Sequence, residues 1–224
     1  MGLYLNPNAD AFQMGLNNQI YVDKTLIITE TNKLVCGQSN FVCMSRPRRF
    51  GKSMVGNLLS AYYSKGCDTR ETFSKMKIGQ VTDYDKYLNK FNVIKLDLNG
   101  LYQSAVSKDL LIEEIDETVR EEFVKQFATI TFKDTDNIVK CISRVYEATG
   151  EKFVIIIDEY DVLVREQVPA SLFQTYLSFL NGLFKNTTLR PAIALAYITG
   201  IMPIVRDKVQ SKLNEFDEYT MIEA

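Results

Sequence analysis

A short loop of the chain, residues 46–53 (RPRRFGKS), joins a strand-like apolar run to a segment with helical periodicity. Strand, Gly-Lys-Ser loop and helix in this order are typical of a phosphate-binding loop. Gly51 lets the backbone approach an anion, and the amides of a helix N-terminus donate to it. Lys52 adds a charge for the β- and γ-phosphates, and the Ser53 hydroxyl can ligate magnesium. The predicted nucleotide-binding residues are Arg46, Pro47, Arg48, Arg49, Phe50, Gly51, Lys52, Ser53 and Met54.

The loop departs from the usual pattern GxxxxGK[ST], because Arg46 stands where that pattern has its first glycine. A second motif supports the interpretation: residues 153–159 (FVIIIDE) form a buried-strand pattern that ends in two acids. Ligands of open α/β sheets bind at such strand ends. Asp158 is predicted to hold magnesium opposite Ser53, and Glu159 to polarise an attacking water. The alternative makes Asp158 a helix N-cap and Glu159 a solvated residue.

Two further polar residues follow apolar runs at the same predicted edge. Thr199 ends the last strand-like run and is a candidate for sensing the γ-phosphate; a hydroxyl satisfied in a strand-end turn is an equal alternative. Together with Lys52 and Glu159 it makes up the predicted catalytic set. Asp161 is predicted to cap a helix, with a supporting role behind the acidic pair as the alternative.

Four apolar runs predict the strands that carry these residues, at 40–45, 92–98, 152–158 and 192–199. Helical apolar stripes lie between them, at 54–63, 112–127, 138–146 and 172–184, after a short helix-like stretch at 24–31. Alternating strands and helices predict an α/β fold with a mainly parallel sheet covered on both faces. Residues 1–33 are interpreted as a polar lead-in segment, and residues 34–224 as one domain.

The composition excludes several functional classes. The 224 residues include 26 basic and 28 acidic side chains, so the net charge of −2 offers no general attraction to nucleic acid. Histidine is absent, which removes Ser-His-Asp catalysis and histidine zinc sites. The four cysteines form no CxxC pair, which favours a reducing compartment. No leader pattern and no apolar run of about 20 residues is present, so we expect a cytoplasmic protein without membrane contact.

Five blocks of the sequence carry a resemblance to a known family. They are residues 21–25 (YVDKT), 45–53 (SRPRRFGKS), 156–161 (IIDEYD), 199–204 (TGIMPI) and 213–216 (LNEF). In this order they resemble the predicted AAA-ATPase-like family of bacteria, in which arginine also replaces the first loop glycine. The resemblance implies a three-layer P-loop NTPase fold of the additional-strand type with sheet order 5-1-4-3-2. Its fifth strand would come from about 218–222.

The resemblance also bears on activity and partners. It implies an ATPase that binds ATP and magnesium and uses hydrolysis to switch conformation or drive a motor. The alternatives are a nucleotide-dependent regulatory module with negligible hydrolysis and, ranked lowest, a small-molecule kinase. Relatives often continue into a C-terminal domain similar to PD-(D/E)xK nucleases, which these residues do not supply; that domain, nucleic acid and a second copy are the partners considered. The candidates for an arginine that acts on the γ-phosphate are Arg46, Arg48, Arg49 and Arg206.

Overall fold

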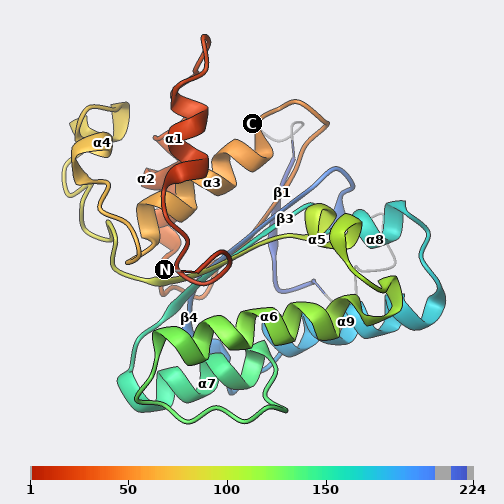
Figure 1. Cartoon of the computed structure of the whole chain (residues 1–224). Helices are drawn as coiled ribbons and strands as arrows, with labels where there is room; N and C mark the ends of the chain where they lie inside the picture. Colours follow the sequence, from red (N-terminus) through yellow and green to blue (C-terminus); the bar gives the residue numbers. More distant parts are fainter. Residues whose placement is uncertain (1, 205–212, 221–224) are drawn as a thin grey trace.

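The computed structural model describes residues 2–204 and 213–220, and it contains a five-stranded sheet (Figure 1). The strands are β1 (Phe41–Ser45), β2 (Asn92–Asp97), β3 (Phe153–Asp158), β4 (Ile193–Gly200) and β5 (Asp217–Tyr219). Their order is β2-β3-β4-β1-β5, and every neighbouring pair is parallel. This is the predicted order 5-1-4-3-2 read from the other edge, so the P-loop NTPase architecture expected from the resemblance is confirmed.

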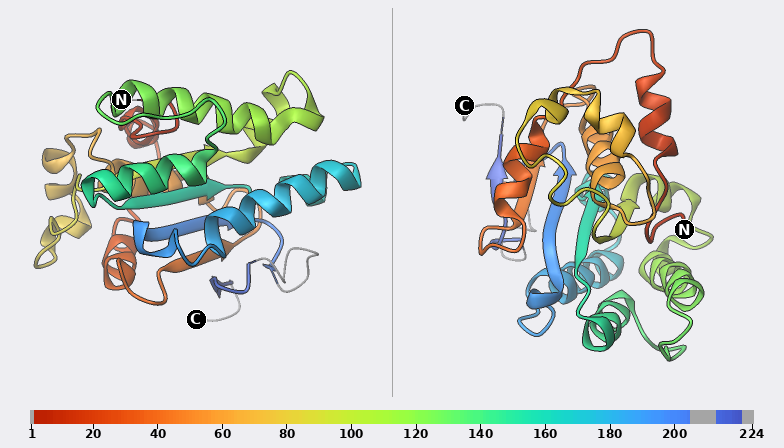
Figure 2. Two further views of the ribbon diagram at one scale, coloured as in Figure 1. Left: turned by 90° about the horizontal axis from the view of Figure 1, so that it is seen from below. Right: turned by 90° about the vertical axis from the view of Figure 1, so that its left-hand side faces the viewer.

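Helices cover both faces of the sheet and give three layers (Figures 1 and 2). One face carries α1 (Asp10–Leu16), α2 (Ile27–Leu34), α3 (Lys52–Tyr63) and α4 (Arg70–Ser74). The other carries α6 (Leu111–Gln126), α7 (Ile138–Thr149) and α9 (Ala170–Phe184). Two separate buried clusters result, one on each side of the sheet. β3 is buried along its whole length because its neighbours and both helical layers enclose it.

Two short helices stand at the carboxyl ends of strands, α5 (Leu98–Ser104) after β2 and α8 (Val162–Arg165) after β3. The predicted second strand reached residue 98, but β2 ends at Asp97. The Asp97 carboxylate accepts hydrogen bonds from the amides of Asn99 and Gly100, each at 3.1 Å, and this starts the helix. The predicted fifth strand at 218–222 is observed as β5 at Asp217–Tyr219; residues 221–222 of that prediction lie outside the described residues.

The N-terminal segment is more ordered than the lead-in that the sequence predicted. Its helix at 24–31 is observed three residues later, as α2, and α1 was not predicted. Leu5 lies antiparallel to Ile94 of β2, and the side chains of Leu5 and Phe12 are fully buried. The Glu122 carboxylate of α6 accepts the amides of residues 3, 4 and 5. The boundary after residue 33 stays a prediction, although this segment belongs to the packed core.

Candidate functional site

The loop after β1 curls around the side chain of Lys52. Gly51 has a φ of 78° and Arg49 a φ of 69°, so the chain turns through the left-handed region twice before α3 begins. The Lys52 ammonium donates to the carbonyl oxygens of Arg46 at 2.9 Å and Pro47 at 3.1 Å, and only 8% of the residue is exposed. The sequence predicted a helix from Met54, but α3 begins two residues earlier, at Lys52. The amides of its first turn therefore face the loop.

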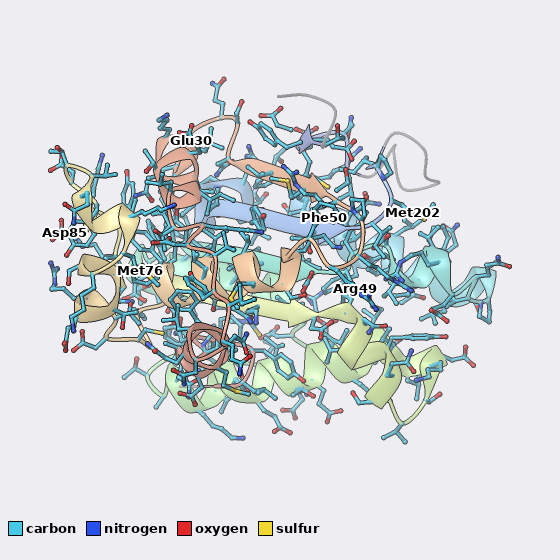
Figure 3. All side chains as sticks on the ribbon, turned by 90° about the horizontal axis from the view of Figure 1, so that it is seen from above. Glu30, Arg49, Phe50, Met76, Asp85 and Met202 are labelled. Atoms are coloured by element: carbon cyan, nitrogen blue, oxygen red, sulfur yellow. The ribbon has the colours of Figure 1, made fainter. Side chains whose placement is uncertain are left out.

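The other predicted loop residues are placed differently from one another. Ser53 is exposed on the first turn of α3, next to Lys52. Met54 packs away from the loop against α1, because a Cβ added at Gly15 would lie 2.0 Å from the Met54 Cε. Figure 3 shows Arg49 and Phe50 on the same side of the molecule as Met202, which follows β4. The arginines at 48 and 49 are exposed, so this side of the loop is cationic.

Sequence reasoning gave no role to Lys24, which the structure brings to the loop. Its ammonium donates to the Phe50 carbonyl oxygen at 3.0 Å, and a Cβ added at Gly51 would lie 2.9 Å from it. Asp23 fixes the segment, because its carboxylate accepts the Thr25 amide at 2.8 Å and the Thr25 hydroxyl at 2.6 Å. The block at 21–25 contains Lys24, but a contact between residues 26 positions apart has no local signal in the sequence.

A hollow of about 280 Å³ lies beside the loop on the α2 side. It combines apolar side chains with cations: its lining is Lys24, Ile27, Met44, Arg46, Phe50, Gly51, Lys52, Val55 and Tyr197. Arg46 is half-buried here, with its Nε 3.2 Å from the Met44 sulfur. Arg46, which stands where the usual loop pattern has its first glycine, thus contributes its side chain to the wall of this hollow.

The two predicted polar groups at the ends of β3 and β4 contact each other. Asp158 is 5% exposed, and its Oδ1 accepts hydrogen bonds from the Thr199 hydroxyl and from the amide of Glu159. Both bonds fall on Oδ1, so Oδ2 takes part in neither. The helix-cap alternative for Asp158 is wrong, since α8 starts only at Val162 and Asp158 binds none of its amides. The Thr199 hydroxyl likewise binds this carboxylate and not a strand-end turn.

Glu159 adopts a conformation that is uncommon for a residue with a side chain, with a φ of 55°. Its carboxylate forms an ion pair with Arg165 of α8, Nη2 to Oε2, at 2.5 Å. The structure therefore places Glu159 beside Asp158 in the chain, as predicted, but gives its side chain a cationic partner that sequence reasoning missed. The sequence signal for this partner is weak, because the two residues are six positions apart and only the turn between β3 and α8 brings them together.

The predicted capping role of Asp161 is wrong. Asp161 occupies the position before α8, but its side chain makes no capping bond there. Its Oδ2 accepts the backbone amides of Ile201 at 3.0 Å and Met202 at 2.9 Å, and it lies 3.2 Å from the Nε of Arg165. Two convergent amides and a guanidinium stabilise a carboxylate more than the amides of one short helix do, so the side chain turns toward the segment after β4.

Lys95 of β2 is a second basic residue that the sequence analysis did not assign to the site. It lies near the carboxyl ends of β2 and β3, where Asp97 and Asp158 stand. In the sheet register Lys95 pairs with Ile156 and Asp97 with Asp158, so both point to the α3 face. The Lys95 ammonium donates to the Asn57 side-chain oxygen of α3. Burial lowers the pKa of Lys95, while the carboxylates of Asp158 and Asp97 act in the opposite direction. The only sequence signal for this role of Lys95 is that it is a lone lysine within an apolar run.

The donor set fits one magnesium ion bound together with phosphates. Among the residues described, no three acidic, histidine or cysteine side chains gather into a cluster that could hold a metal by themselves. Magnesium in nucleotide sites takes few protein ligands and relies on phosphate oxygens and water, so an exposed hydroxyl at Ser53 and one carboxylate at Asp158 match its needs. In the described part of the chain, no helix has the length and apolar character to cross a membrane.

A family model described as "Predicted AAA-ATPase" matches residues 10–210. No curated protein matches the chain. Among solved structures, the Aeropyrum pernix ORC2 protein in its ADPNP-ADP complexes is similar over 91% of this chain and 50% of its own, with 9% identity and a TM-score of 0.44. C. elegans PCH-2 is similar over 94% and 39%, with 12% identity and a TM-score of 0.34. The chain thus spans half or less of these structures.

Proposed function

Because this chain belongs to the predicted AAA-ATPase family, we propose that it binds ATP with magnesium at residues 46–53 and hydrolyses it. One observation carries the proposal: the loop around Lys52 and the bonded pair Asp158–Thr199 stand at the carboxyl ends of three adjacent strands, β1, β4 and β3. In the register, Met44 pairs with Thr199 just before the loop begins. Ligands of such sheets bind at this edge.

Each residue has a role that its contacts support. The ammonium of Lys52 exchanges its two loop carbonyls for oxygens of the β- and γ-phosphates. The amides at the start of α3 donate to the β-phosphate, whose charge the helix N-terminus stabilises. Ser53 and Asp158 would hold magnesium, which would supply positive charge to neutralise the phosphates. Thr199 orients the Asp158 carboxylate through their hydrogen bond.

The residue that activates the attacking water is the glutamate directly after β3. We assign Glu159 as the general base that accepts a proton from the attacking water. We assign the nucleotide base and ribose to the hollow between α2 and the loop, because its apolar walls and cations suit a purine attached to phosphates. Conformational switching, a second copy of the chain, a nuclease-like domain and nucleic acid stay predictions of the sequence; Arg206 lies outside the described residues.

The proposal is tested by replacing Glu159 with glutamine, which keeps the size of the side chain and removes the base. We expect phosphate release to fall by about 100-fold or more while magnesium-dependent ATP binding is retained. Turnover by steady-state phosphate release and affinity by titration calorimetry measure the two effects. Glu166→Gln, an exposed glutamate at the end of α8, is the matched control and is expected to leave both unchanged.

A module that binds ATP without hydrolysing it is the second candidate, and the Glu159–Arg165 ion pair favours it. Wild-type protein that binds ATP with magnesium but releases no phosphate above the Glu159→Gln level would establish this candidate and contradict hydrolysis. Failure to bind ATP at all would contradict both.

Lys24 is expected to contribute to nucleotide affinity from outside the loop. Its ammonium already lies within hydrogen-bond distance of the loop backbone. Lys24→Ala should therefore weaken binding of ATP with magnesium by about three- to ten-fold, as for the loss of one partly solvated charge contact. Titration calorimetry at low salt measures the change. Lys33→Ala in α2, an exposed lysine paired with Glu30, should not alter the affinity; an equal loss in both variants would mean that Lys24 acts only through the general field.

A further inference from the structure

Arg165 lies between two carboxylates of the acidic segment. Its Nη2 is 2.5 Å from Oε2 of Glu159, and its Nε is 3.2 Å from Oδ2 of Asp161. The arginine side chain is only 14% exposed, compared with 27% for Glu159 and none for Asp161. The guanidinium therefore neutralises both acids in a largely dehydrated setting, where ion pairs are stronger than on the surface.

The two carboxylates differ in how firmly the protein holds them. Asp161 is fixed by the amides of Ile201 and Met202 in addition to Arg165. The contact described for the Glu159 carboxylate is the one with Arg165. Of the two partners, Glu159 is thus the one that can leave without breaking other bonds, and Arg165 would still have Asp161.

The ion pair with Arg165 hinders Glu159 from acting as the general base. The guanidinium holds the Glu159 carboxylate at 2.5 Å, so this side chain is not free to turn toward a water. The same bond occupies an oxygen that would otherwise accept a hydrogen bond from water. Glu159 also keeps a left-handed backbone with a φ of 55°, which is uncommon for a residue with a side chain and persists only where contacts enforce it.

We propose that Arg165 is a positioning residue that holds Glu159 away from the attacking water, and that hydrolysis requires Arg165 to release Glu159 and pair with Asp161 alone. The inference rests on the proposed function, because it assigns a restraint to that base. The link to the nucleotide is short: Asp161 binds the segment directly after Gly200, and Thr199 precedes it. Movement of that segment reaches Arg165 through the Asp161 carboxylate.

The test is to remove the guanidinium and to measure kcat and KM for ATP. Arg165→Gln and Arg165→Met, which keeps the apolar stem, are each expected to raise kcat by about three- to ten-fold with KM unchanged, the effect of one lost ion pair on a catalytic step. Arg165→Lys retains a cation and should stay near the wild-type kcat. The gain should vanish when Glu159→Gln is added to either variant. Arg144→Gln, which breaks the Arg144–Asp136 pair of 2.6 Å, is the matched control and should not change kcat.

The outcomes separate this inference from the proposed function. If wild-type protein hydrolyses ATP and neither variant is faster, the restraint is overturned while the ATPase stands. If Arg144→Gln accelerates turnover as much as Arg165→Gln does, the gain comes from general loosening and the restraint is also overturned. If no variant, wild type included, hydrolyses the ATP that it binds, both proposals fail. Thermal melts of all variants show which of them are folded. If one of the two replacements at Arg165 does not fold, the other still tests the restraint.

Discussion

Replacement of Lys52 by alanine is expected to weaken binding of ATP with magnesium by about 100-fold, which corresponds to about 3 kcal/mol. Only 8% of the lysine is exposed, so water screens its charge poorly. Without it, the loop loses the cation that the β- and γ-phosphates would meet. It also loses the two bonds to the carbonyls of Arg46 and Pro47 that keep the loop curled when no phosphate is bound.

Titration calorimetry with ATP and magnesium measures this effect. Lys75→Ala, at an exposed lysine that pairs with Glu71 four residues away, is the control and should bind as the wild type does. A Lys52→Ala protein that is folded and retains wild-type affinity would show that the loop is not the phosphate site. Circular dichroism should show that the fold survives, because only local loop contacts are removed.

The second large effect is expected on stability. Asp161→Ala should lower the free energy of unfolding by about 3 to 5 kcal/mol, because it leaves the amides of Ile201 and Met202 without their acceptor and removes the charge that lies 3.2 Å from the Arg165 Nε. The carboxylate is fully buried, so water does not replace it. Denaturation in urea, followed by circular dichroism, measures the loss.

Two comparisons define what that loss means. Asp161→Asn keeps an oxygen for the amides but not the charge for Arg165, so it should fall between wild type and Asp161→Ala. Glu30→Ala removes the acid of an exposed pair with Lys33 and should leave the midpoint unchanged. Equal midpoints for Asp161→Ala and wild type would mean that other contacts anchor the segment after β4.

The sequence was sufficient for features that are encoded locally. The β-branched run that ends in Asp158 predicts a buried parallel strand, because five consecutive apolar residues directly before an acid are typical of a central strand that is covered on both faces. Gly51 predicts the turn into α3, and its φ of 78° confirms the need for glycine. The sheet order did not come from periodicity; it followed from the resemblance between sequence blocks, and the structure confirms it.

The features that were missed depend on contacts between distant segments. The Lys24 bond to the loop and the binding of Asp161 to the amides after β4 span 26 and 40 or more positions. Asp161 shows the limit clearly. An aspartate before a helix is a frequent cap, and only the return of β4 beside β3 supplies stronger donors. The assignment of catalytic, nucleotide and magnesium residues stays a prediction.

The strip of residues 4–6 along β2 has a consequence for behaviour in a crowded solution. The outermost strand of a sheet presents free amides and carbonyls that can recruit another extended chain. Here the Tyr4 carbonyl accepts the Lys95 amide at 2.9 Å, and the Asn6 amide donates to the Val93 carbonyl at 2.7 Å. Pro7 then follows, which has no amide to offer. The chain thereby shields its own edge from unwanted self-association, and removing residues 1–8 should make the protein prone to aggregate.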